Sequence, residues 1–164
     1  MKKYLCLLLC LLLCLSALSC SKKKDTAEDI LGGIMSELKD LPKGKIYLAG
    51  AEQGDEENLS EETAESLYGE SAVQYLSLTR DYAIYLSSFA EPCEISIFIC
   101  YSSSDALKIE RMCRERADAL LVALRESELC DTLLDATVIR KGRTVAFAMT
   151  EKPSQTQRII KKFI

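Results

Sequence analysis

Two pairs of short segments with alternating apolar residues flank one long amphipathic stretch, and this order constrains the fold more than any other feature of the chain. Residues 80–88 and 93–101 form the first pair, and residues 136–149 contain the second. Between them, apolar residues recur at three- and four-residue spacing and predict a helix over residues 105–126. We expect an α+β fold in which a four-stranded, mainly antiparallel sheet in ββαββ order is covered by this helix.

The alternation also predicts which side chains face the long helix. The stronger apolar face of residues 93–101 is formed by Ile95, Ile97 and Ile99, which we expect to face the helix together with Val145, Phe147 and Met149. The opposite face is too apolar to be bare, so we expect another helix to cover part of it. Its members would be Ala83, Tyr85, Phe98, Cys100, Ala146 and Ala148.

Shorter elements flank this unit. Residues 26–41 have helical spacing, and residues 45–50 are expected to form a short strand or an extended piece. Residues 60–68 are expected to form a helix that ends at Gly69, and Pro153 opens a final short helix. Two further details are expected: Ser104 as the N-cap of the long helix, and Lys141 with Gly142 as the hairpin turn.

The beginning of the chain has the pattern of a bacterial secretory signal. Lys2 and Lys3 precede an apolar run over residues 4–15, which is shorter than the roughly 20 residues that a membrane span needs. Ser19, a small residue, then stands directly before Cys20, an order that resembles the lipobox of bacterial lipoproteins. In that motif the cysteine is acylated and becomes the first residue of the mature protein. The alternative is an ordinary secretory signal that is cut near Ser19.

This interpretation predicts three parts: a signal peptide with lipobox (1–19), an anchor with an N-terminal helix (20–41) and a single α+β domain (42–164). Several acyl chains hold a protein stably on a membrane. We therefore expect a protein that is lipid-anchored at Cys20 on the outer face of the cell membrane. The three lysines that follow, Lys22, Lys23 and Lys24, would lie at the lipid headgroups.

Charge argues against nucleic acid as a partner. The chain has 21 basic and 25 acidic residues, and removal of Lys2 and Lys3 with the signal leaves a net charge of −6. Proteins that bind nucleic acid present basic patches to the phosphates. The partners that we expect are the membrane, through the N-terminal lipid anchor, and an unidentified protein or small-molecule ligand.

No catalytic or metal-binding motif is present. The chain has no histidine, which rules out Ser-His and Cys-His nucleophiles and leaves zinc without its usual imidazole ligands. The acids at 55–57 and 61–62 lack the spacing of a calcium loop, and they suit the positive end of a helix dipole. We therefore predict no catalytic residue, no cofactor and no metal.

Several short motifs resemble a known family. Leu67-Tyr68-Gly69 ends a short helix, an Ala90-Glu91 step leads into the strand with Glu94, and a hairpin turns at Gly142. With the helical stretch 106–116, these features resemble domain of unknown function 4358, a family of small bacterial lipoproteins. The chain differs from the family pattern at Phe89, and its segment after the long helix is shorter. The resemblance implies the fold and the membrane location, and it implies no activity.

Four cysteines remain after the signal and Cys20. Cys93 and Cys100 would lie about 23 Å apart on one strand, and Cys113 is expected on the core face of the long helix, away from both. If a disulfide forms, we expect it between Cys93 and Cys130, because the chain passes Cys93 again just after the helix ends. The alternative is that all four are reduced thiols.

Two functions remain open. The first is a membrane-anchored extracytoplasmic binding or interaction module. The second is a hydrolase-type enzyme whose acidic or lysine residues converge only in the folded protein. A pocket lined by acids with strongly shifted pKa values would favour the enzyme.

Overall fold

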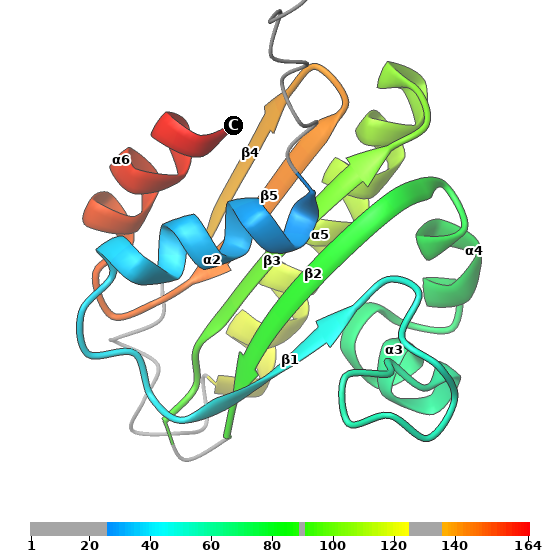
Figure 1. Ribbon diagram of the computed structural model, residues 1–164, viewed down its shortest axis with the longest axis horizontal. Helices are drawn as coiled ribbons and strands as arrows, with labels where there is room; N and C mark the ends of the chain where they lie inside the picture. The colour runs from blue at the N-terminus through cyan, green and yellow to red at the C-terminus, as the bar shows by residue number, and fades with distance from the viewer. Residues whose placement is uncertain (1–25, 89–90, 125–135) are drawn as a thin grey trace, which may run out of the picture.

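A five-stranded antiparallel sheet forms the middle layer of the protein, and helices cover both of its faces (Figure 1). The computed structural model describes residues 26–88, 91–124 and 136–164. The described elements are, in chain order, α2 (Ala27–Glu37), β1 (Gly44–Leu48), α3 (Glu61–Tyr68), α4 (Ala72–Leu76), β2 (Thr79–Ser87), β3 (Glu94–Cys100), α5 (Ser103–Leu124), β4 (Thr137–Lys141), β5 (Thr144–Met149) and α6 (Pro153–Phe163).

The strand order is β1-β2-β3-β5-β4, and each neighbouring pair is antiparallel. Helices α2 and α6 cover one face, while α5, with α3 and α4 beside it, covers the other (Figure 1). The predicted α+β class and the ββαββ unit are confirmed: β2 pairs with β3, and β4 pairs with β5, on either side of α5 in the chain.

The prediction of four strands is wrong, because the sheet has a fifth strand. Gly44–Leu48 pairs along its length with β2, and Tyr47 lies opposite Ile84 in that register. The sequence predicted a short strand or an extended piece here. Helices α3 and α4 lie between β1 and β2 in the chain, so no short turn sequence indicates that these two strands pair.

The expected orientation of β3 is also wrong. Phe98 lies opposite both Tyr82 and Val145, so these three side chains share one face of the sheet, the face under α5. The three isoleucines of β3 instead lie under α2 and α6: Ile95, Ile97 and Ile99. All seven residues of β3 are buried. Because helices cover both faces, the relative strength of the two apolar faces could not decide the orientation.

Local signals place some of the helix ends, although α2 ends at Glu37, before the expected residue 41. Thr26 caps α2 in a capping box with Asp29, and Ser60 accepts a hydrogen bond from the backbone N–H of Thr63 at the start of α3. Gly69 ends α3 with φ +84°, a value that favours glycine. The N-cap of α5 is not Ser104, since the side chain of Ser102 accepts the bond from the Asp105 backbone. Helix α4 was not predicted.

The β4–β5 turn lies one residue later than expected. Lys141 pairs with Thr144 as the last residue of β4, which leaves Gly142 and Arg143 as the two turn residues. Gly142 has φ +61°. A positive φ at the first of two turn residues matches the tight hairpin turns that suit twisted strands.

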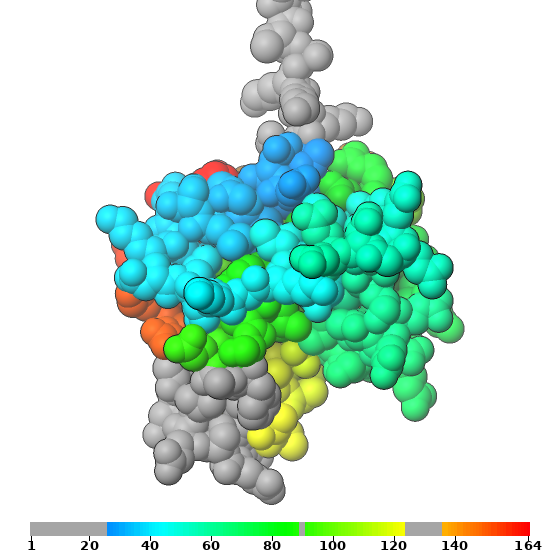
Figure 2. Space-filling model, turned by 60° about the horizontal axis from the view of Figure 1, so that its bottom comes forward, coloured from blue at the N-terminus to red at the C-terminus, as the bar shows by residue number. Residues whose placement is uncertain are grey.

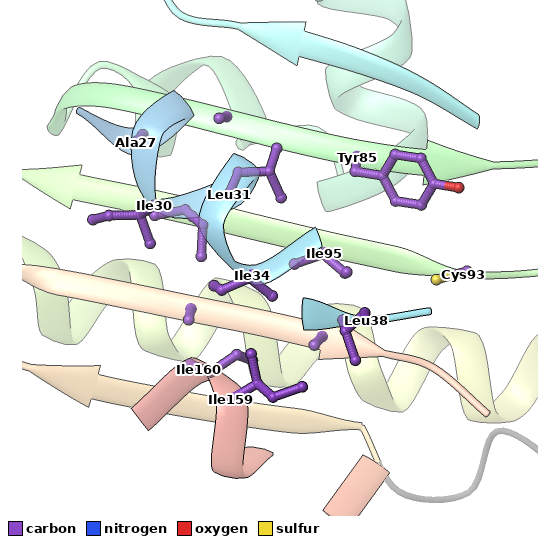
Figure 3. Packing of buried hydrophobic residues seen from close by; sticks show 14 of the residues in the cluster. Ala27, Ile30, Leu31, Ile34, Leu38, Tyr85, Cys93, Ile95, Ile159 and Ile160 are labelled. Carbon is purple, nitrogen blue, oxygen red and sulfur yellow. The ribbon is translucent and has the colours of Figure 1, made fainter. Parts of the chain in front are cut away.

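Helix α2 belongs to the core of the domain. Figure 3 shows Ile30, Leu31 and Ile34 pointing at the sheet beside Ile159 and Ile160 of α6. All five are at most 6% exposed. The helix expected within residues 20–41 therefore packs on the same core as the domain assigned to residues 42–164. Within the described part of the chain, no helix combines the length and the apolar character that crossing a membrane requires.

Candidate functional site

A fully buried carboxylate marks the candidate site. Glu94 is the first residue of β3, and its side chain has no exposure to solvent. A charge that leaves water is strongly destabilising unless other groups pair with it and hydrogen-bond to it. The surroundings of Glu94 therefore show what the fold has assembled around it.

Both oxygens of this carboxylate have partners. The Tyr68 hydroxyl donates to Oε1 over 2.8 Å, and Ser96 Oγ donates to the same oxygen over 3.0 Å. Arg116 donates from Nε and from Nη2 to Oε2, each over 3.1 Å. Tyr68 and Ser96 are themselves 3.1 Å apart. Among the described residues, no buried side-chain nitrogen or oxygen is left without a hydrogen-bond partner.

Three elements contribute to this cluster, which we call the Glu94 network: Glu94 and Ser96 of β3, Tyr68 of α3 and Arg116 of α5. Tyr68 is the last residue of its helix, and its ring packs edge-on against Phe98 at a centroid distance of 6.0 Å. The guanidinium of Arg116 reaches the sheet from α5 and is 12% exposed. The network thus joins α3 and α5 to the middle of the sheet.

Burial governs the chemistry of Tyr68. Loss of solvent, followed by the neighbouring charge of Glu94, holds the pKa of its phenol well above the ordinary value of 10.0. Tyr68 therefore stays protonated at neutral pH and acts as a hydrogen-bond donor. In this arrangement Glu94 accepts four hydrogen bonds and has no oxygen facing solvent, which suits a structural clamp better than a general base.

The described cysteines have the character of buried apolar residues. Burial raises the pKa of Cys93 to about 12 and that of Cys100 to about 11, and it holds the pKa of Cys113 well above its ordinary value. A thiol is nucleophilic only as thiolate, so these three are unreactive at neutral pH. All three are free thiols in the structure.

Their placement corrects part of the prediction. Cys93 and Cys100 do point to opposite faces of β3, as expected from their odd spacing. Cys113, expected to lie apart from Cys100, belongs to the same buried cluster under α5. The error follows from the reversed orientation of β3. Cys130 and Cys20 lie outside the described residues, so the Cys93–Cys130 pairing and the lipidation of Cys20 stay predictions.

The acids at residues 55–62 lie in a loop and at the start of a helix. Glu61 and Glu62 are in the first turn of α3, next to the positive end of the helix dipole. Asp55 accepts a hydrogen bond from the backbone N–H of Glu52. In the part of the chain that the structure describes, no three Asp, Glu, Cys or His residues are grouped so that they could hold a metal ion.

The Glu94 network was missed by sequence reasoning. Glu94 and Ser96 alternate with Ile95 and Ile97, so they lie on the face that we expected a second helix to cover in part, and neither residue stands out there by type. Phe98 and Cys100 continue that same side with apolar residues. A glutamate two residues before a serine, on a face that then becomes apolar, is the signal that could have indicated a buried polar cluster.

Comparisons with known proteins add no relative. No protein-family model matches the chain, and neither a curated protein nor a solved structure matches it. The resemblance to domain of unknown function 4358 therefore stays a prediction.

Proposed function

We propose that the protein is a lipoprotein anchored at Cys20 on the outer face of the cell membrane, where its α+β domain acts as a binding or interaction module. One observation carries the anchor: an apolar run over residues 4–15, too short to span a bilayer, is followed by Ser19-Cys20 and then by three lysines at 22–24. The fold and location that the family resemblance implies agree with this proposal.

The start of the folded domain suits a short tether. The backbone N–H of Ala27, the first residue of α2, donates to Oδ2 of Asp81 on β2 over 2.7 Å. Thr26 caps the same helix end. Only six residues separate Cys20 from Ala27. A lipid at Cys20 would therefore hold the core of the domain close to the membrane surface.

The contacts of the buried carboxylate remove Glu94 as a candidate for the hydrolase alternative. The hydrolase alternative needs an acid or a lysine that can reach a substrate. Glu94 is the fully buried acid of the described residues, and Tyr68, Ser96 and Arg116 occupy both of its oxygens. A binding module needs a stable scaffold and an accessible surface, and the Glu94 network stabilises the scaffold.

Cell fractionation of the wild type and of Cys20→Ala tests the anchor. We expect the wild type in the membrane fraction, and we expect Cys20→Ala to be released in soluble form or to accumulate unprocessed. Cys130→Ala is a matched control that removes a different cysteine and should fractionate like the wild type. A Cys20→Ala protein that is processed and stays in the membrane fraction would contradict the proposal. If the anchor is confirmed, chemical crosslinking before purification from membranes would identify a protein partner of the domain.

A further inference from the structure

The charges of this chain are strongly segregated along its sequence. Residues 46–79 contain eight acids and no lysine or arginine: Glu52, Asp55, Glu56, Glu57, Glu61, Glu62, Glu65 and Glu70. Residues 136–164 contain one acid, Glu151, and seven bases: Arg140, Lys141, Arg143, Lys152, Arg158, Lys161 and Lys162.

The fold turns this segregation into two charged sides. Strands β1 and β4 are the two edges of the sheet. The acidic segment leaves β1 and forms α3 and α4 at one side, while the basic segment forms β4, β5 and α6 at the other (Figure 1). Figure 2 shows the two sides well separated, with residues 55–75 in green-blue on the right and the orange and red C-terminal residues at the left. We call the side formed by β4 and α6 the basic edge.

The bases of this edge are presented to solvent. Helix α6 buries Ile159 and Ile160, and its outer surface carries Arg158, Lys161 and Lys162, all exposed. Lys162 pairs with Glu37 over 2.5 Å, and Arg140 of β4 pairs with Glu110.

Other bases of the edge have no such partner. Arg143, Arg158 and Lys161 form no ion pair with any acid among the described residues, and all three are exposed. Lys141 donates to the backbone oxygen of Ile164 over 2.6 Å, so the hairpin and the end of α6 belong to one continuous surface. This surface is therefore free to attract an anionic partner.

The tether brings the basic edge within reach of a membrane. Helix α6 lies beside α2, with the Phe163 ring packed against Gly33. Gly33 lies six helical steps after Ala27, a rise of about 9 Å. The seven steps from Cys20 to Ala27 extend to at most about 25 Å. A lipid at Cys20 would thus hold α6 near the membrane with enough slack for it to lie on the surface.

We propose that the basic edge docks on the anionic lipid surface to which the protein is anchored, with β1, α3 and their acids turned away from it. This inference rests on the proposed lipid anchor. Each basic residue near an anionic surface strengthens binding about fivefold. The mature chain has a net charge of −6, so an anionic surface would repel the acidic side of the molecule and attract the basic edge, in addition to the lysines beside the anchor. The tether favours a lipid surface over a second copy of the chain, because it fixes the lipid nearby.

Tryptophan fluorescence in vesicles tests the orientation, since the chain has no tryptophan of its own. The acylated full chain would carry one reporter, Gln157→Trp on α6 or Ser66→Trp on α3, both at exposed positions. Vesicles would contain equal parts of phosphatidylglycerol and phosphatidylcholine, with a fraction of brominated lipid as quencher. We expect the α6 reporter to be quenched at least about twofold more strongly than the α3 reporter, and we expect the difference to vanish in pure phosphatidylcholine.

Charge reversal provides the matched control. Arg158→Glu with Lys161→Glu should abolish the extra quenching of the α6 reporter. Lys108→Glu with Arg111→Glu on α5 changes the net charge by the same amount and should leave the extra quenching of the α6 reporter intact. Equal quenching of both reporters in an acylated, vesicle-bound protein would overturn the orientation but not the anchor.

Two further outcomes would also overturn the inference. If the processed full chain carries no acyl group at Cys20 and does not float with vesicles, the anchor is overturned as well. Quenching of the α6 reporter that changes with the amount of protein bound per vesicle, and does not change with the fraction of anionic lipid, would assign the basic edge to contact with a second copy of the chain.

Discussion

Glu94 is the residue at which the polar contacts of the core converge, and Arg116 supplies its counter-charge. Replacing Arg116 by methionine keeps most of the side-chain volume and leaves a carboxylate buried without its ion pair. Breaking a buried pair in this way typically costs about 3–5 kcal/mol. We predict that Arg116→Met lowers the free energy of unfolding by about that amount, as measured by urea denaturation.

A rescue variant and a control variant test the cause of the loss expected for Arg116→Met. Glu94→Gln added to Arg116→Met removes the buried charge and keeps an acceptor for Tyr68, so it should recover part of the loss. Arg111→Met removes an exposed arginine of the same helix, which contacts Tyr75 and Glu115 at the surface, and should cost less than about 1 kcal/mol. A single Arg116→Met variant as stable as the wild type would mean that the ion pair does not stabilise the core.

The cysteines give a second prediction at the scale of single residues. Because burial raises the pKa of Cys93 to about 12, its thiolate population at pH 8 is very small. We predict that iodoacetamide labels Cys93, Cys100 and Cys113 only after unfolding. Peptide mapping of the non-reduced protein decides whether Cys93 pairs with Cys130, and a bridge involving Cys113 would contradict its burial under α5.

At the scale of elements, β3 is the strand on which both layers of helices depend. Ile97 is fully buried on the α2 face, whereas Leu120 of α5 is only partly buried against the opposite cluster. Ile97→Asp places an unpaired charge in the core, so we predict a loss of several kcal/mol in thermal unfolding. Leu120→Asp should cost clearly less. Equal losses would contradict the packing described for α5.

The same strand shows what can be predicted from the sequence and what cannot. The pairing of β2 with β3 and the β4–β5 hairpin follow from short connections between apolar runs, and Thr26, Ser60 and Gly69 are local signals for helix ends. The orientation of β3 does not follow, because both of its faces are buried. Partners far away in the chain fix it, and the same is true of β1.

The candidate site failed to appear in the sequence for the same reason. Tyr68, Glu94 and Arg116 are far apart in the chain, and each residue alone is unremarkable in type. Only the packing of α3 and α5 against β3 brings the Tyr68 hydroxyl and the Arg116 guanidinium within 3.1 Å of the Glu94 carboxylate. A polar cluster of this kind is a property of tertiary contacts, so it becomes visible only once the register of the strands is known.

At the scale of the whole molecule, Glu110 joins the α5 layer to the edge of the sheet. Hydrogen bonds from Arg114 and then Arg140 lower the pKa of its carboxyl below the ordinary value of 4.5. A lowered pKa in the folded state stabilises the protein above the unfolded pKa, and this contribution is lost as the pH falls through the folded value.

We therefore predict that Glu110→Gln is less stable than the wild type at pH 7, by less than about 1 kcal/mol per ion pair. The difference should shrink as the pH falls below 4.5. Thermal unfolding of both proteins across this pH range measures it. A stability difference that is constant with pH would show that the charge of Glu110 contributes nothing.

The lipid anchor is the central claim about the whole molecule, and intact-mass spectrometry of the mature protein tests it most directly. We predict a chain that begins at Cys20 and carries the added mass of a diacylglyceryl group, with or without a further acyl chain on the amino group. Alkaline hydrolysis of the ester-linked chains should remove most of that mass. A mature protein that begins at another residue, or that begins at an unmodified Cys20, would contradict the account.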